Sequence, residues 1–207
     1  ASLPALDGTE IIETDDDELK KASFLRTPQG IMALFRQRDE ACDFSVATRE
    51  LSLALDDVQD PGNLGTIIRI ADWFGIENVF CSQGTVDVYN PKTVRAAMGA
   101  LFRLPMVITE DIPAAITDLR TYGYDVRAAA LTDTAQPLGA YTVTPKTVFV
   151  IGNEGHGLSE QTICACGQTV YIPMSERAES LNAAVAASVL MWHFTKDMSQ
   201  GGVTNEL

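Results

Sequence analysis

Apolar residues change their spacing repeatedly from Arg49 onward. Short apolar runs, typical of strands buried on both faces, alternate with longer segments whose apolar residues recur every three or four positions. This alternation indicates βαβ units and therefore predicts an α/β fold with a mainly parallel sheet and helices on both faces. The predicted strands are Leu51–Val58, Asn78–Cys81, Leu104–Ile108, Asp125–Leu131, Thr147–Ile151 and Thr169–Pro173.

The predicted helices occupy the segments between these strands. The clearest is Leu64–Phe74, whose apolar residues form one stripe and which ends at Gly75. The other predicted helices are Thr93–Leu101, Ile112–Thr121, Ser159–Cys166 and Ser180–Lys196. Ahead of this region we expect a short helix over Glu18–Leu25, a turn over Thr27–Gly30 and a strand over Ile31–Phe35.

The pattern divides the chain into three parts. Residues 1–42 form an acidic segment that is too small to be a domain, residues 43–200 form the α/β domain, and residues 201–207 form a tail. No apolar run reaches the 18 or so residues of a membrane span. The first twenty residues carry seven acids and one lysine, so they do not resemble a signal peptide, and we expect a cytoplasmic protein.

The net charge of −13 does not favour an extended phosphate-binding surface. The acids are concentrated at one end, since residues 1–20 contribute −6 of that charge. Between Pro61 and Arg103 the balance is slightly positive, and this stretch includes Arg69, Lys92 and Arg95. A locally basic face on an acidic protein is therefore compatible with the sequence.

Metal chemistry is not expected. Cys42, Cys81, Cys164 and Cys166 lack the paired C-x-x-C spacing of a zinc site, and four cysteines are too few for a disulfide scaffold in a chain of 207 residues. Reduced, buried cysteines are the simpler interpretation.

A first polar stretch, Asp60–Ala71, begins where a predicted strand passes into a helix. Open α/β sheets bind ligands at the carboxyl ends of their strands. Asn63 stands where a helix N-cap is expected, so capping and a functional role both account for it. Arg69 lies on the helix outside the apolar stripe, so it can point toward the strand edge or into solvent.

A second stretch, Val148–Ser159, is an apolar strand followed by three glycines in six residues. Glycines permit positive φ and close backbone approach to a ligand. The stretch lacks the Lys-Ser/Thr ending of a Walker loop and the later acid of a dinucleotide-binding fold. Glu154 suits an uncharged or cationic ligand better than a phosphate.

A third stretch, Tyr171–Ser188, combines a strand, a polar loop and an alanine-rich helix that opens on Ser180-Leu181-Asn182. Ser180 is interpreted either as the N-cap of that helix or as a functional hydroxyl. The small residues that follow allow close packing against another helix, inside the chain or in a dimer.

Together, the three stretches resemble motifs 1, 2 and 3 of the SpoU (TrmH) family of RNA 2′-O-ribose methyltransferases in the SPOUT superfamily. The family patterns N-x-G-x-x-x-R-x-A, G-x-E-G-x-G and I-P-M…S-L-N-x-x-x-A all occur here, in that order, within residues 27–197. The resemblance implies a C-terminal deep trefoil knot. Periodicity alone predicts only an ordinary doubly wound sheet, because threaded chains are rare.

The resemblance also implies an activity and a site. The activity is transfer of a methyl group from S-adenosyl-L-methionine to a ribose 2′-hydroxyl in rRNA or tRNA. The implied catalytic positions are Arg69, Asn63, Glu154, Ser180 and Asn182, and the implied cofactor-binding positions are Thr132, Gly152, Asn153, Ile172, Leu181 and Asn182. In the family the arginine is assigned as the base, although its high pKa favours a role in binding phosphate and stabilising charge.

The implied partners are RNA and a second copy of the chain, packed through the knotted region. Residues 27–33 look like the end of an N-terminal RNA-binding domain of the L30e type, of which 1–42 would be a remnant. Two other functions stay open: a catalytically inactive RNA-binding protein of the same fold, and a metabolic enzyme that binds a nucleotide at Gly152–Gly157.

Overall fold

The computed structural model describes residues 10–23, 25–37, 51–175 and 180–200, and side chains as far as residue 196. The chain divides into two compact units, 1–39 and 40–207, which are described separately. The predicted boundary at residues 42 and 43 and the predicted tail 201–207 lie outside the described residues.

Among the described residues of the first unit, one helix forms, α1 (Asp16–Ala22). It begins two residues earlier than predicted, because the Asp15 side chain caps it by accepting a hydrogen bond from the Glu18 N–H. The predicted strand over Ile31–Phe35 is wrong, since residues 31–37 form no strand. Ile31 is 68% exposed and Leu34 92% exposed, so the apolar run that suggested a strand is not buried in this unit.

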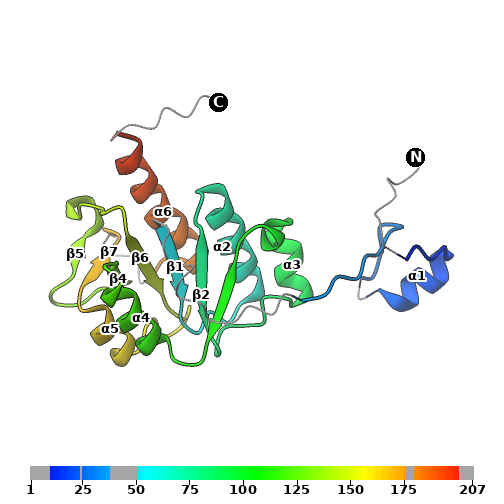
Figure 1. Cartoon of the computed structure of the whole chain (residues 1–207), viewed down its shortest axis with the longest axis horizontal. Coiled ribbons are helices and arrows are strands. Elements are labelled where there is room, and N and C mark those ends of the chain that lie inside the picture. The colour runs from blue at the N-terminus through cyan, green and yellow to red at the C-terminus, as the bar shows by residue number, and fades with distance from the viewer. Residues whose placement is uncertain (1–9, 24, 38–50, 176–179, 201–207) are drawn as a thin grey trace. The chain divides into compact units, whose positions relative to one another are not determined.

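The second unit is built on a seven-stranded sheet in the order β3-β2-β1-β6-β4-β7-β5 (Figure 1). All six strand pairs are parallel, which confirms the predicted mainly parallel α/β fold. The strands are β1 (Leu51–Leu55), β2 (Asn78–Ser82), β3 (Met106–Thr109), β4 (Asp125–Ala129), β5 (Gln136–Pro137), β6 (Thr147–Ile151) and β7 (Thr169–Tyr171).

Helices cover both faces of this sheet. One face packs against α2 (Pro61–Trp73), α3 (Pro91–Ala97) and α6 (Ala183–Gln200), and the other against α4 (Ile112–Thr121) and α5 (Glu160–Cys166). The central strands β1 and β6 are buried along their whole length, which explains why both read as continuous apolar runs. The knot that the family resemblance implies stays a prediction.

The structure corrects three details of the predicted elements. Helix α2 begins at Pro61 rather than Leu64, because Asp60 caps it and proline suits the first helical position. Helix α3 ends at Ala97 instead of continuing to Leu101, because Met98 is left-handed with φ 49°, and a separate 3-10 turn follows at Ala100–Phe102. The short strand β5 was not predicted, since two residues carry no periodic pattern.

Gly65 fixes how closely α2 and α3 approach. A Cβ added at this glycine would lie 2.5 Å from the Thr93 carbonyl oxygen and 2.6 Å from the Ala96 Cβ. Only a residue without a side chain lets the two backbones lie at this distance. The contact sets the position of α2, whose first turn contributes to the site.

A polar cluster near the start of β4 and β6 anchors α6. The Tyr141 hydroxyl donates to Asp125 Oδ2 at 2.8 Å, and the Arg127 guanidinium lies 4.5 Å from the Tyr141 ring centroid. Burial raises the pKa of Tyr141 to about 12. His193 of α6 contacts the Tyr141 carbonyl oxygen through Nε2 at 3.1 Å, so the cluster connects α6 to the loop that precedes β6.

The sheet order determines where polar loops meet. From β1 the chain builds outward through β2 and β3, and then returns to the other side of β1, where β6 pairs with it. The turns that follow β1 and β6 therefore lie side by side at a point where the strand order reverses. Such points are the usual ligand sites of open α/β sheets.

Candidate functional site

The first turn of α2 supplies one side of the site. The Asp60 carboxylate caps the helix by accepting from the Asn63 N–H at 2.8 Å, and it pairs with Lys92 Nζ at 3.2 Å. These contacts, the backbone hydrogen bond first, lower the pKa of Asp60. The interpretation of Asn63 as the N-cap is wrong: it lies three residues inside, so its side chain is available for other contacts.

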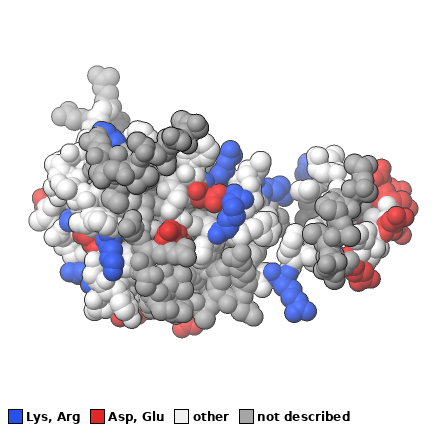
Figure 2. All heavy atoms as spheres, turned by 45° about the horizontal axis from the view of Figure 1, so that its top comes forward, with Lys and Arg blue, Asp and Glu red and all other residues white. Residues whose placement is uncertain are grey.

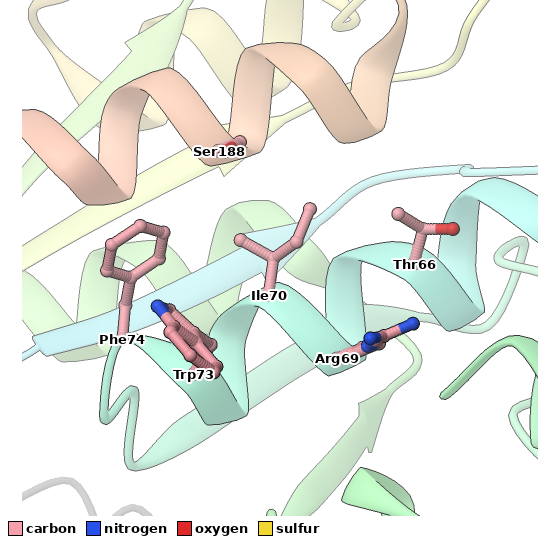
Figure 3. A pocket seen from close by; sticks show the side chains of 6 residues that line it. All are labelled: Thr66, Arg69, Ile70, Trp73, Phe74 and Ser188. Atoms are coloured by element: carbon pink, nitrogen blue, oxygen red, sulfur yellow. The ribbon is translucent and has the colours of Figure 1, made fainter. Parts of the chain in front are cut away.

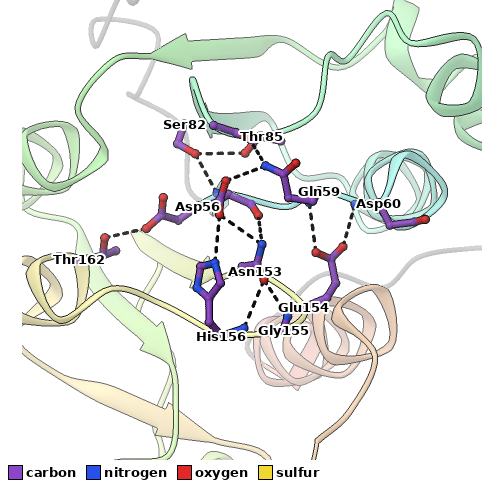
Figure 4. A network of polar contacts seen from close by, with 12 residues as sticks. Asp56, Gln59, Asp60, Ser82, Thr85, Asn153, Glu154, Gly155, His156 and Thr162 are labelled. Atoms are coloured by element: carbon purple, nitrogen blue, oxygen red, sulfur yellow. Dashed lines mark hydrogen bonds and ion pairs between the residues drawn. The ribbon is translucent and has the colours of Figure 1, made fainter.

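Glu154 reaches across from the glycine-dense turn after β6 (Figure 4). Its carboxylate accepts from the backbone N–H groups of Gln59 at 3.1 Å and Asp60 at 3.2 Å, and from Asn63 Nδ2 at 2.9 Å. Burial alone would raise the pKa of Glu154, but these hydrogen bonds outweigh it and lower the pKa. Glu154 is therefore a charged acceptor that joins two turns.

Asn182 connects the third stretch to the first turn of α2. Its Nδ2 donates to Asn63 Oδ1 at 3.0 Å, while its Oδ1 accepts from the N–H groups of Ala184 and Val185. Asn182, not Ser180, thus caps α6. Ser180 is exposed and lies two residues before the cap. The structure consequently joins Glu154, Asn63 and Asn182, one residue from each motif, in a single chain of hydrogen bonds.

Arg69 lies elsewhere on α2. It is six residues from Asn63, which is about 9 Å along the helix and about 240° around it. Its side chain is exposed and lines a groove of about 370 Å³ between α2 and α6, together with Thr66, Ile70, Trp73, Phe74 and Ser188 (Figure 3). Of the two orientations left open by the sequence, the exposed one is correct.

The residues expected to bind the cofactor lie on three loops. Thr132 follows β4, Gly152 follows β6 and Ile172 follows β7, and β4 pairs with both other strands, so these loops share one edge of the sheet. Thr132 and Ile172 are half-buried, and Thr132 Oγ1 lies 2.8 Å from Thr169 Oγ1. Leu181 is 48% exposed beside Asn182.

Gly152 is required by the shape of its own turn. A Cβ there would lie 2.5 Å from the Gly157 carbonyl carbon and 2.6 Å from the Leu158 nitrogen. The turn closes through reciprocal backbone hydrogen bonds between Asn153 and Gly157, at 3.1 and 3.0 Å. The glycines therefore make the turn tight, and they leave its main-chain groups near the strand edge.

The sequence interpretation missed several residues of this site. Asp60 could have been recognised, because an acid before proline at the start of a helix is a capping signal. Gln59 and Asp57 contact the second turn, as described below, but no local pattern distinguishes them. Their roles follow from the pairing of β1 with β6, which only the folded chain reveals.

The cysteines of the described residues are all free thiols. Cys81 and Cys166 are free and buried, Cys164 is free and exposed, and burial raises the pKa of Cys166 to about 12. Cys42 lies outside the described residues. Within the described ranges, no three His, Cys, Asp or Glu residues gather in a way that could hold a metal ion. No helix in the same ranges is long and apolar enough to span a membrane.

Comparison with known proteins identifies the family. Residues 50–192, well over half of the chain, match the model of the SpoU rRNA Methylase family. The chain belongs to this family. All three motifs lie inside the matched range, so the contacts among Asn63, Glu154 and Asn182 join the SpoU motifs in space.

Individual relatives agree with this SpoU assignment. The 23S rRNA (guanosine(2553)-2′-O)-methyltransferase RlmP of Bacillus subtilis is 35% identical over 186 residues, which cover 90% of this chain and 73% of that protein. The chain spans 58% of rRNA methyltransferase 3 from Xenopus laevis and 63% of a Synechocystis relative.

Solved structures show the same fold. The SpoU methyltransferase AviRb from Streptomyces viridochromogenes, in complex with the cofactor AdoMet, is 33% identical with a TM-score of 0.68, and the match covers 77% of this chain and 63% of AviRb. The AdoMet-bound rRNA methyltransferase from Sinorhizobium meliloti is 35% identical with a TM-score of 0.65, covering 71% and 56% of the two chains.

Proposed function

We propose that this SpoU-family chain transfers a methyl group from S-adenosyl-L-methionine to a ribose 2′-hydroxyl of ribosomal RNA. The observation that carries the proposal is the hydrogen-bonded chain Glu154–Asn63–Asn182, which connects the three family motifs at the carboxyl edge of the sheet. The names of the relatives, which act on 23S rRNA, favour ribosomal over transfer RNA as the substrate.

The cofactor would lie against the loops after β4, β6 and β7. These loops offer main-chain groups at Gly152 and Ile172, the Thr132 hydroxyl, and exposed apolar side chains at Leu131 and Met174. That combination fits an adenosine with an uncharged base and a cationic sulfonium, and Leu181 would add a further apolar contact. When bound, S-adenosyl-L-methionine supplies a methyl group on a good leaving group.

The chain's residues would act on the nucleophile. Transfer of the methyl group to the 2′-oxygen would release the thioether S-adenosylhomocysteine, and the hydroxyl proton would pass to water as the new carbon–oxygen bond forms. Arg69 is assigned the binding of the adjacent phosphate and of the developing negative charge, because a guanidinium holds its proton too firmly to be a good base. Ser180 and Asn182 would hydrogen-bond near the ribose.

Charge on α2 and α3 supports an RNA substrate. Arg69 lies on α2, Lys92 and Arg95 lie on α3, and Arg103 follows the 3-10 turn after α3. Figure 2 shows several basic side chains on the surface of the protein, some of them next to acidic ones. Lys92 and Arg103 pair with Asp60 and Asp72. Within the described ranges, Arg69 and Arg95 have no ion pair, so they contribute positive charge for phosphate contacts.

The groove between α2 and α6 is the proposed homodimer surface. Trp73 is 84% exposed and Trp192 58% exposed, an unusual exposure for tryptophan, and Phe74 contacts Trp192 with ring centroids 6.5 Å apart. Contiguous exposed apolar surface marks an interaction site. Because Arg69 lines the same groove, a second copy seated there would bring Arg69 next to the partner.

The N-terminal segment and the knot are part of the same proposal. Residues 1–42 would be the joint to, or remnant of, an L30e-like RNA-binding domain, and the C-terminal part of the chain would form the trefoil knot that the family resemblance implies. Acting on ribosomal RNA, the protein would work where ribosomes are assembled, which is the cytoplasm in bacteria.

Calorimetry and methyl transfer test the proposal together. The purified chain should bind S-adenosyl-L-methionine but not ATP, and should incorporate tritiated methyl groups into rRNA as alkali-resistant 2′-O-methylnucleotides. Binding of ATP without binding of the methyl donor would overturn the enzyme class in favour of a nucleotide-binding metabolic enzyme. Incorporation into tRNA alone would overturn the ribosomal substrate.

A further inference from the structure

Two turns of the site are joined by a pair of residues whose contact with each other the family motifs do not predict. The turn after β1 contributes Asp57, and the glycine-dense turn after β6 contributes Asn153 (Figure 4). Asn153 Nδ2 donates to the Asp57 carbonyl oxygen at 2.8 Å and to Asp57 Oδ2 at 3.2 Å. We refer to these contacts as the Asp57–Asn153 pair.

Asp57 has an unusual backbone conformation. Its φ of 61° places it in the left-handed region, which disfavours residues other than glycine, although aspartate tolerates it better than most. Its N–H donates to Ser82 Oγ at 2.8 Å. Its carboxylate also has little room, since a Cβ on Gly84 would lie 2.8 Å from Oδ1. Strained residues held by many contacts are frequent at functional sites.

Asn153 uses both ends of its amide. While Nδ2 binds Asp57, Oδ1 accepts from the N–H groups of Gly155 at 2.7 Å and His156 at 3.3 Å. Only a side chain with a donor and an acceptor at this length makes all of these contacts. The Asn153 side chain is thus engaged inside the protein, so a contact with the cofactor would fall to its main chain.

The pair acts on Glu154, the residue next to Asn153. The Glu154 carboxylate binds the Gln59 N–H, and the Gln59 side chain binds Asp57 Oδ1 at 2.7 Å. Asp57 therefore holds both the turn that carries Glu154 and the turn that Glu154 contacts. His156 adds a further contact, with Nε2 3.3 Å from Asp57 Oδ2.

We propose that Asp57 and Asn153 are positioning residues, which hold the Glu154 carboxylate against Asn63 and so keep the three motifs assembled. This role rests on the proposed function, because Glu154 is assigned to the catalytic site there. Small displacements of a supporting residue lower turnover by misaligning the groups it supports.

Exchange of the two residues provides the sharpest test. Asn153→Asp keeps the shape of the side chain, but removes the donor and places two carboxylates in contact. We expect kcat to fall at least 20-fold at saturating methyl donor and RNA, with methyl-donor affinity within about threefold of the parent. The exchanged variant Asp57→Asn/Asn153→Asp has the net charge of the parent and again pairs one donor with one acceptor. Its kcat should therefore be at least fivefold higher than that of Asn153→Asp.

A second readout does not depend on activity. The pKa of the Glu154 carboxyl, followed by NMR, should rise in Asn153→Asp and return toward the parental value in the exchanged variant. Asn153→Ala, which adds no charge, should also raise the pKa of Glu154. It replaces Asn153→Asp in this test if Asn153→Asp fails to fold. Asp56→Asn is the matched control: Asp56 accepts from Thr162 Oγ1 at 2.7 Å on the α5 side of the same turn, and kcat should stay within twofold.

Two results would overturn the positioning role. One is parental kcat and a parental Glu154 pKa in both Asn153 variants; the other is no recovery in the exchanged variant. If the parent transfers no methyl group to any RNA, the proposed function fails, while the Glu154 titration still decides whether the pair positions this carboxylate.

Discussion

Helix α2 takes part in two regions that differ in how completely the chain organises them. At its first turn, Asn63 contacts Glu154 at 2.9 Å and Asn182 at 3.0 Å, and the backbone N–H groups of Gln59 and Asp60 also have partners. Further along the helix, Arg69 and Trp73 line a groove in which Trp73 is 84% exposed.

The contrast indicates that two parts of helix α2 have different roles. At a rigid site, hydrogen bonds inside the chain hold the groups in place before the reaction begins. Little free energy is then needed to reorganise these groups during the reaction. A surface that binds a partner has its apolar and charged groups exposed in the free protein. Arg69 belongs to the second kind, so under the proposed function RNA or a second copy would place its side chain.

Replacing Arg69 tests the groove most severely. We expect Arg69→Ala to lower methyl transfer at least 100-fold, as loss of a group that stabilises developing charge does, while methyl-donor affinity stays within about threefold. Single-turnover kinetics and calorimetry measure the two quantities. Lys146→Ala, a cation at the opposite edge of the sheet, is the control. Equal loss of donor binding and turnover would place Arg69 in the cofactor site instead.

Placing a charge in the groove tests the dimer. Trp73→Glu should convert a dimer to a monomer in sedimentation and reduce methyl transfer by roughly tenfold or more, because a carboxylate in an apolar contact is costly to desolvate. Tyr122→Glu, on α4 at the other face of the sheet and 55% exposed, should leave both properties unchanged. A dimer that persists in Trp73→Glu would move the interface to another surface.

Removing the charge of Glu154 tests the rigid region. Glu154→Gln should lower kcat about tenfold. The new amide NH2 would face the Gln59 N–H, the Asp60 N–H or Asn63 Nδ2, which are themselves donors. Because the pKa of Glu154 is lowered in the fold, the carboxylate stabilises the protein above its ordinary pKa, and this is lost as the pH falls through the lowered value. The difference in Tm between parent and variant should therefore be largest above the ordinary pKa of a glutamate and shrink as the pH falls through the lowered value.

Removal of the Asp60 cap of α2 is expected to have the smallest effect on stability and turnover. Asp60→Ala should cost about 1 kcal/mol of stability, the usual contribution of an N-cap, and lower kcat by a few-fold because Asn63 moves with the first turn. Asp111→Ala removes an equivalent cap, which accepts from the Ala114 N–H at 2.9 Å, from α4. Denaturation should show similar losses for both variants. If kcat falls equally in both, the first turn of α2 has no special role.

Much of the fold could be predicted because burial leaves a clear pattern. The runs Leu51–Leu55 and Thr147–Ile151 are buried on both faces, so they read as strands without ambiguity. Ile31–Phe35 has the same apolar character, but the fold does not bury it, and the predicted strand was wrong. Local composition cannot distinguish the two cases, since burial depends on what the rest of the chain brings near.

The candidate site shows the same limit at the level of single residues. Asn63, Glu154 and Asn182 could be selected because each stands in a recognisable motif, and the structure joins them. For Asn63 and Ser180 the sequence left capping open as one of two roles, and neither residue is the cap, because capping depends on where the first helical hydrogen bond forms. Asp57 carries no signal at all: its left-handed backbone is stabilised by partners 25 and 96 residues away.

The sequence by itself determined the alternation of strands and helices, the order of the three motifs and hence the family. These properties are local, since they depend on spacing along the chain and on residue type. The tertiary structure alone decided that Glu154 binds the first turn of α2, that Arg69 lies in a separate groove, and that Asp57 and Asn153 meet. Parallel pairing of β1 with β6 brings together turns nearly one hundred residues apart, and no local pattern encodes that proximity.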